Sequence, residues 1–148
     1  MARGDSKKVA EYDFKSGGGS YNNSSDTFSW VLVTDAFGDI DEETALNLAS
    51  FTQATIGGNY AGKTALTNVS WSRTGSVSTL TYDNISFSAD ASNPTDAKCI
   101  VIINDTSSSD DAFKITDITT DGSTAVDLTS GFTLNVNASG SATVTTNA

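Results

Sequence analysis

One segment of the chain has the spacing of a phosphate-binding P-loop, G-x-x-x-x-G-K-[ST]: Gly57-Gly58-Asn59-Tyr60-Ala61-Gly62-Lys63-Thr64. In a P-loop, backbone N–H groups surround the phosphates and the lysine reaches the β- and γ-oxygens. Such a loop must lead into a helix whose N-terminus faces the phosphate. The residues after Lys63 are β-like and have no helical apolar face. We therefore expect a glycine-rich hairpin loop here and no nucleotide site.

Five carboxylates are concentrated within nine residues: Asp35, Asp39, Asp41, Glu42 and Glu43. Hard cations bind about six to eight such oxygens, but the spacing of an EF-hand is not met. Paired carboxylates also hydrolyse glycosides, although sequence cannot show their separation. We expect the solvated start of one short helix over residues 39–50, where carboxylates favour the helix dipole. Asp35, Asp39 and Asp41 are the residues that could take up a cation opportunistically, and we expect no cofactor.

The composition excludes several kinds of site. The chain has no His, which removes Ser-His-Asp and Cys-His pairs and every His-ligated metal. A single Cys, Cys99, can form neither an internal disulfide nor a cysteine-based metal site. Eight basic and 18 acidic residues give a net charge of −10, whereas nucleic-acid-binding domains concentrate Lys and Arg. No apolar run approaches the ~20 residues of a membrane span. We therefore expect no enzyme, and neither nucleic acid nor a membrane as a partner.

The first 27 residues differ in composition from the rest. They contain half of the basic residues and end in a run rich in Gly, Ser and Asn. Such a segment buries too little apolar area to offset its ordering entropy. We therefore divide the chain into an N-terminal arm and loop, residues 1–27, and a single β-rich domain, residues 28–148. The arm is expected to become ordered only against a partner. Its expected contact residues are the basic Arg3, Lys7 and Lys8 and the apolar Val9, Tyr12 and Phe14.

Apolar residues in the rest of the chain have the pattern of short strands. Residues 28–33 are aromatic and β-branched, with Trp30 expected in the core, and residues 132–137 alternate apolar and polar. The most apolar run, residues 99–103, has strand length and is expected to be a central strand covered on both faces. Cys99, which begins that run, is expected to be a small buried side chain. Together these patterns predict a mainly β protein, an antiparallel β-sandwich or barrel of about eight strands with one short helix and an extended N-terminal arm.

Four segments follow one another in an informative order: Trp-Val-Leu-Val-Thr-Asp (30–35), Gly-Lys-Thr (62–64), Asp-Asn-Ile-Ser-Phe-Ser (83–88) and Ala-Lys-Cys-Ile-Val-Ile-Ile-Asn-Asp-Thr (97–106). A Thr/Ser-rich loop and three further strand patterns then close the chain. Over residues 28–137 this order resembles a group of small virion proteins of tailed bacteriophages. The members that it resembles are auxiliary capsid proteins, also called decoration or cement proteins.

The resemblance implies a structural role in a virus particle, made in the cytoplasm of a host bacterium and located in the virion. The expected partners are the major capsid protein or other virion proteins, with a homo-oligomer, preferably a trimer, on a three-fold site. A tail, neck or fibre-attachment component remains an alternative. A carbohydrate-binding β-sandwich is another, for which an exposed Trp71 would be the better stacking residue.

Overall fold

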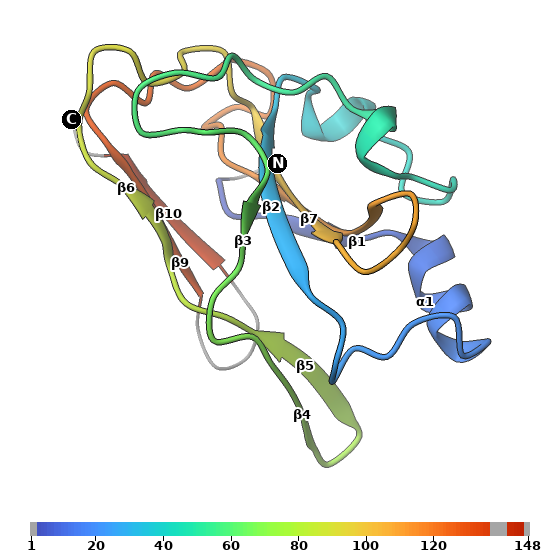
Figure 1. Cartoon of the computed structure of the whole chain (residues 1–148). Coiled ribbons are helices and arrows are strands. Elements are labelled where there is room, and N and C mark those ends of the chain that lie inside the picture. Colours follow the sequence, from blue (N-terminus) through green and yellow to red (C-terminus); the bar gives the residue numbers. More distant parts are fainter. Residues whose placement is uncertain (1–2, 137–141, 147–148) are drawn as a thin grey trace.

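The computed structural model describes residues 3–136 and 142–146 and consists mainly of antiparallel strands (Figure 1). Residues 1–2 of the expected arm and residues 137–141 and 147–148 of the expected domain lie outside the described part. The strands are β1 (Ser6–Lys8), β2 (Phe28–Val33), β3 (Thr64–Ala65), β4 (Ser70–Thr74), β5 (Val77–Thr81), β6 (Ile85–Phe87), β7 (Cys99–Asn104), β8 (Asp111–Asp117), β9 (Phe132–Val136) and β10 (Ala142–Thr146). The described helices are α1 (Ala10–Gly17) and the 3-10 turns η1 (Phe37–Asp39) and η2 (Leu48–Ser50). The mainly β, antiparallel fold is thereby confirmed.

The larger sheet has five strands in the order β1-β8-β7-β2-β3. Its central strands, β2 and β7, are buried at every position because side chains cover both faces of the sheet. Trp30 pairs with Ile102 and Leu32 with Ile100, so these four side chains share one face. The expectation of a central apolar strand that begins at Cys99 is confirmed. Burial raises the pKa of the Cys99 thiol to about 12, so this side chain is an unreactive part of the core.

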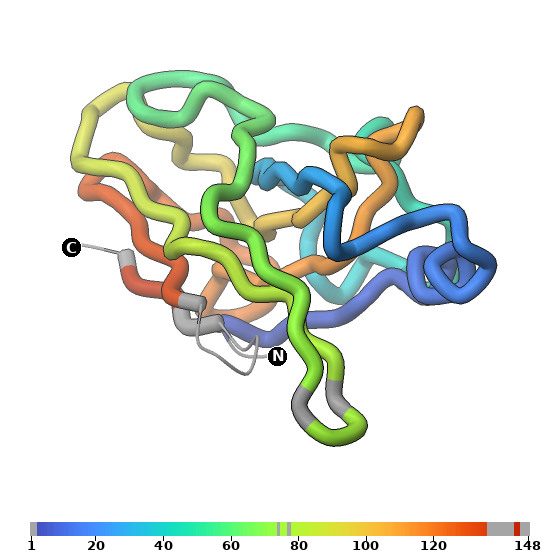
Figure 2. The backbone as a smooth tube through the Cα atoms, turned by 60° about the horizontal axis from the view of Figure 1, so that its bottom comes forward, coloured from blue at the N-terminus to red at the C-terminus, as the bar shows by residue number. Residues whose placement is uncertain are grey.

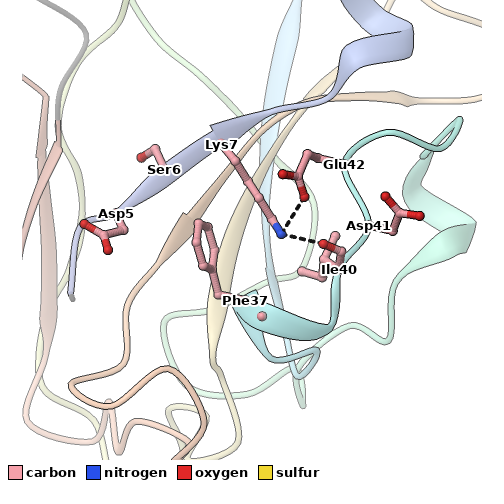
Figure 3. A pocket seen from close by; sticks show the side chains of 8 residues that line it. Asp5, Ser6, Lys7, Phe37, Ile40, Asp41 and Glu42 are labelled. Atoms are coloured by element: carbon pink, nitrogen blue, oxygen red, sulfur yellow. Dashed lines mark hydrogen bonds and ion pairs between the residues drawn. The ribbon is translucent and has the colours of Figure 1, made fainter. Parts of the chain in front are cut away.

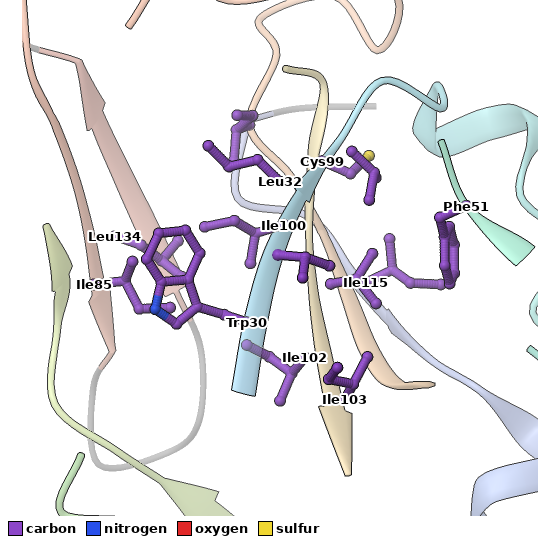
Figure 4. Close-up of a cluster of buried hydrophobic side chains, with 14 of the residues drawn as sticks. Trp30, Leu32, Phe51, Ile85, Cys99, Ile100, Ile102, Ile103, Ile115 and Leu134 are labelled. Atoms are coloured by element: carbon purple, nitrogen blue, oxygen red, sulfur yellow. The ribbon is translucent and has the colours of Figure 1, made fainter. Parts of the chain in front are cut away.

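A three-stranded sheet, in the order β10-β9-β6, lies against that face of the larger sheet. Figure 4 shows the Trp30 ring between the two sheets, next to Ile85 and Leu134, which pair across β6 and β9. Phe51 and Ile115 lie on the opposite face of the larger sheet. The part of the core that contains Trp30, as expected, is therefore enclosed between two sheets, as in a β-sandwich. The part that contains Phe51 and Ile115 covers the other face of the larger sheet.

The prediction of a short helix over residues 39–50 is wrong. This segment holds only the 3-10 turns η1 and η2 at its two ends, with irregular turns between them. The Asp41 carboxylate accepts a hydrogen bond from the Glu43 N–H at 3.1 Å, and the Thr44 hydroxyl donates to the Asp41 carbonyl at 2.8 Å. Such local bonds compete with the hydrogen bonds of a helix. The carboxylates therefore stabilise turns.

The expectation of an extended N-terminal arm is also corrected, because residues 3–27 are folded onto the sheets. β1 pairs with β8 as an edge strand of the larger sheet, and α1 follows it at once. Val9 and Tyr12 are each only 1% exposed. The Gly4 N–H also donates to the Asp117 carbonyl at 2.8 Å. Two buried side chains and an added strand offset an ordering cost that composition alone made appear too large.

β4 and β5 form a hairpin that projects away from both sheets (Figures 1 and 2). Among the described strands they pair only with each other. At the base, Leu80 is buried and its cross-strand partner Trp71 packs partly against the core. Nearer the tip, Arg73 and Ser78 are exposed, and Gly75 forms the turn with a φ of 62°. The outer half of the hairpin is therefore held mainly by strand pairing.

Candidate functional site

A group of five residues, here called the N-terminal junction, fixes α1 to the larger sheet: Tyr12, Tyr21, Asn23, Asn104 and Phe113. The Tyr12 ring stacks on Tyr21 with centroids 4.5 Å apart and meets the edge of Phe113 at 4.9 Å. Its hydroxyl donates to Asn23 Oδ1 at 2.7 Å and accepts from Asn104 Nδ2 at 2.9 Å. These contacts connect the helix to β7 and β8, so α1 has a defined position.

Asp111, at the start of β8, adds charge to this junction. Its carboxylate accepts hydrogen bonds from Lys15 Nζ at 3.3 Å and from the Tyr21 hydroxyl. Burial raises the pKa of Tyr12 to about 12. Burial, followed by the hydrogen bond to Asp111, raises the pKa of Tyr21. Both phenols therefore keep their protons, and remain hydrogen-bond donors, throughout the physiological pH range.

Phe14 lies on the same helix and is 77% exposed, whereas Tyr12 is buried. Residues two apart on a helix do not face the same way, so α1 turns one aromatic into the core and the other to solvent. Val9 and Tyr12 are part of the core and cannot serve as contact residues, which corrects that part of the expectation. Of the three apolar residues expected to contact a partner, Phe14 is the one at the surface.

Lys7 crosses an open groove of about 700 Å³ between β1 and residues 37–42 (Figure 3). Its ammonium lies 2.9 Å from the Glu42 carboxylate, donates to the Ile40 carbonyl and lies 4.7 Å from the centroid of the Phe37 ring. The bond to Lys7 lowers the pKa of Glu42. Lys7 therefore connects β1 to the η1 segment and is neutralised there, so it does not present a charge to an acidic partner.

The other two basic residues of the expected arm differ from Lys7. Lys8 is exposed, and its ammonium lies 5.6 Å from the centroid of the Phe113 ring, within the range of a cation–π contact. Arg3 is half-buried beside Gly4, where the chain meets the end of β8. Lys8 and Phe14 are thus the two expected contact residues whose side chains are exposed.

Asp35, Asp39 and Asp41 line one open depression of about 300 Å³ together with Lys98. Asp35 accepts a hydrogen bond from the Thr52 N–H at 2.8 Å, and Asp41 caps a turn as described above. Within residues 3–136 and 142–146, no three His, Cys, Asp or Glu side chains are placed to hold a metal ion together. The fold brings these carboxylates to one surface without arranging them as a set of ligands.

The segment with P-loop spacing is a turn, as expected, and leads into β3. Gly57 and Tyr60 bond to each other through both backbone N–H groups, at 3.1 and 3.0 Å. Lys63 Nζ lies 2.5 Å from Asp105 and 3.2 Å from Asp110. The Asp105 carboxylate raises the pKa of Lys63, and Lys63 lowers the pKa of Asp105. Two carboxylates therefore neutralise this lysine, which ties β3 to the loop after β7.

The projecting hairpin is a candidate contact surface that the sequence pattern did not reveal. The residues after Lys63 have a β-like pattern, which predicts strands but not their place outside the two sheets. At the base, Thr67 Oγ1 and Asn68 Nδ2 both donate to Asp83, at 3.0 and 2.7 Å. The available signal was the scarcity of apolar residues, since Trp71 and Val77 are the only ones between residues 70 and 79. A strand pair with so few apolar side chains cannot lie across a core.

Comparisons with protein-family models, with curated proteins and with solved structures each give no match to this chain. Among the residues described, no helix is long and apolar enough to cross a membrane.

Proposed function

We propose that this chain is a non-enzymatic virion structural protein, a decoration or cement protein that binds the outside of a capsid and bridges neighbouring subunits. The order of its sequence segments supports this class, through the resemblance to small virion proteins of tailed bacteriophages. The observation that carries the proposal is Phe14, exposed on a helix that the N-terminal junction holds in place. The proposed partners are the major capsid protein or another virion protein, and the proposed location is the virion.

A fixed helix makes an exposed aromatic side chain an effective contact. Aromatic residues are enriched in the buried cores of protein interfaces. Full burial of a Phe side chain contributes about 1.5–3 kcal/mol. Because Tyr12 already holds α1 against the sheet, docking of Phe14 in an apolar pocket requires little further ordering of the chain. The α1 surface therefore replaces the extended arm as the proposed capsid contact, with Lys8 beside the Phe113 ring at the same end of the sheet.

A bridging protein also needs a second contact surface. α1 and the β4–β5 hairpin project from different parts of the molecule in both views (Figures 1 and 2). Two such projections allow one copy to touch two neighbours. Repetition over a symmetric shell then adds avidity to contacts that are individually weak. A trimer on a three-fold site remains part of this proposal.

Immunogold labelling of purified virus particles tests the location. An antibody against the chain is expected to label the whole shell. Label confined to the neck or tail would favour the alternative of a tail, neck or fibre-attachment component. Particles without label would contradict a virion protein, and a response of tryptophan fluorescence to added glycans would then favour the carbohydrate-binding alternative.

Co-sedimentation with shells that lack the protein tests the contact itself. Phe14→Ala is expected to weaken shell binding by roughly 10- to 100-fold, the equivalent of the burial energy of the ring. Ile56→Ala is the matched control, because Ile56 is another large apolar residue that is 62% exposed, in a loop far along the chain from α1. Equal binding of Phe14→Ala and wild type would show that α1 is not the contact.

A further inference from the structure

The edge strands of this molecule are protected to different degrees. An open edge presents unpaired N–H and C=O groups to other chains, and proteins usually block it with charges, proline or very short strands. β1 contains two lysines and β4 contains Arg73. β3 has two residues and β6 has three. Each of these four edges therefore has one of the usual protections.

β5 and β10 have none of these protections. Each is five residues long, and their sequences, Val-Ser-Thr-Leu-Thr and Ala-Thr-Val-Thr-Thr, contain no charged residue and no proline. Val and Thr, which favour strands, fill seven of the ten positions. In the described part of the chain, β5 pairs only with β4 and β10 only with β9. The fold thus leaves two long, uncharged edges open to pairing.

We propose that β5 of one copy of this chain pairs with β10 of a second copy. The hairpin of the first copy then extends the three-stranded sheet of the second. The contact is head-to-tail, since each copy offers β5 to one neighbour and β10 to another. Repetition of such a contact gives a closed ring or an open filament, and only the ring leaves no edge unpaired. Pairing of β5 with β5 would leave β10 open in every copy. The head-to-tail contact covers both open edges.

Two further observations support a second copy of this chain as the partner of the open edges. A lone two-stranded hairpin is marginally stable in water, whereas three or more strands support one another; docking places β4 and β5 at the end of a larger sheet. The charges at the two edges are also compatible. Residues 128–148, which include β9 and β10, contain no charged residue, and the only charged residue of 70–81 is Arg73. No like charge therefore opposes the approach of the hairpin to β10 of another copy.

The inference does not depend on a virion role, and purified protein is sufficient to test it. Light scattering behind size exclusion is expected to give a closed oligomer of the 15.3 kDa wild-type chain. Ser78→Glu in β5 and Thr145→Glu in β10 each place a charge on an open edge at an exposed position. Both are expected to give monomers. Because Ser78 lies opposite Arg73, the new glutamate also forms a favourable cross-strand pair that keeps the hairpin formed. Ser86→Glu, on the short edge β6, is the control and is expected to keep the wild-type mass.

Mixing the two variants distinguishes a head-to-tail contact from a symmetric one. Ser78→Glu protein keeps an intact β10, and Thr145→Glu protein keeps an intact β5, so the equimolar mixture is expected to form a complex of twice the monomer mass. A monomeric wild type, an associated single variant or a mixture that stays monomeric would each overturn the proposal. Circular dichroism checks that both variants keep the β-sheet signal. Ser78→Lys or Thr145→Lys replaces a variant that loses it.

Discussion

The N-terminal segment and the β4–β5 hairpin both lie outside the two packed sheets, yet they are held in opposite ways. The N-terminal segment has few apolar residues, but two of them, Val9 and Tyr12, are buried. The hairpin has regular strands, but its outer half has little apolar surface to bury, and Arg73 and Ser78 there are exposed. Composition therefore indicated an extended arm for a segment whose side chains are in fact part of the core. A few fully buried side chains fix a segment more firmly than regular strand pairing does.

The largest effect of a single substitution is expected at the N-terminal junction. Tyr12→Ala should lower the free energy of unfolding by about 3–5 kcal/mol, because it leaves a cavity in place of a large buried ring. It also removes the hydroxyl partner of Asn104 Nδ2. Phe14→Ala, on the same helix, should change this free energy by no more than about 0.5 kcal/mol, since Phe14 is exposed. Urea denaturation measures both variants.

Deletion of residues 1–15 sharpens the same contrast. An extended arm would tolerate this deletion with the fold intact. Here it removes β1, Val9 and Tyr12 together, so we expect loss of the cooperative unfolding transition. A truncated protein that unfolds at the wild-type urea concentration would show that the N-terminal segment does not stabilise the fold.

The hairpin should open locally without unfolding of the sheets. Hydrogen exchange followed by mass spectrometry is expected to show weak protection at residues 70–81 and protection close to the global limit in β2 and β7, whose positions are all buried. The Ser78→Glu variant is the protein to use, so that association does not hide the effect. Hairpin protection equal to that of β2 in this variant would mean that the hairpin is an integral part of the core.

The central sheet could be predicted from the sequence because continuous apolar runs, such as residues 99–103, leave few alternatives to a strand covered on both faces. The N-terminal segment could not, because the burial of Tyr12 depends on Asn104 and Phe113, both more than ninety residues away along the chain. Phe14 was expected to contact a partner together with Val9 and Tyr12, and only the position of α1 shows that Phe14 is exposed whereas the other two are buried. The open edges of β5 and β10 depend on sheet order, which no local pattern encodes.

Substitution of one glycine in each region tests the same comparison through smaller changes in stability. Gly17 ends α1, and a Cβ there would meet nothing within 4 Å. Gly17→Ala should therefore stabilise the protein by about 0.5–1 kcal/mol, since Ala is the better helix residue. Gly75 has a φ of 62°, which costs another residue about 1–2 kcal/mol. Gly75→Ala should thus speed hydrogen exchange in β4 and β5 while leaving the urea midpoint almost unchanged. A large drop in that midpoint would couple the hairpin to the core.

The smallest expected effect concerns Lys63, which lies between the two regions in sequence. Its partly exposed ion pairs with Asp105 and Asp110 are worth about 0.2–1 kcal/mol, so Lys63→Met should cost that much at neutral pH. Because Lys63 lowers the pKa of Asp105 below its ordinary 3.8, this contribution is present above that value and is lost as pH falls through the lower, folded-state pKa. Wild type and Lys63→Met should therefore converge in stability in acid. Lys98→Met is the control, because Lys98 has no ion pair among the described residues, and it should show no such convergence. If Lys63→Met remains less stable than wild type in acid, the contribution of Lys63 comes from packing of its aliphatic stem.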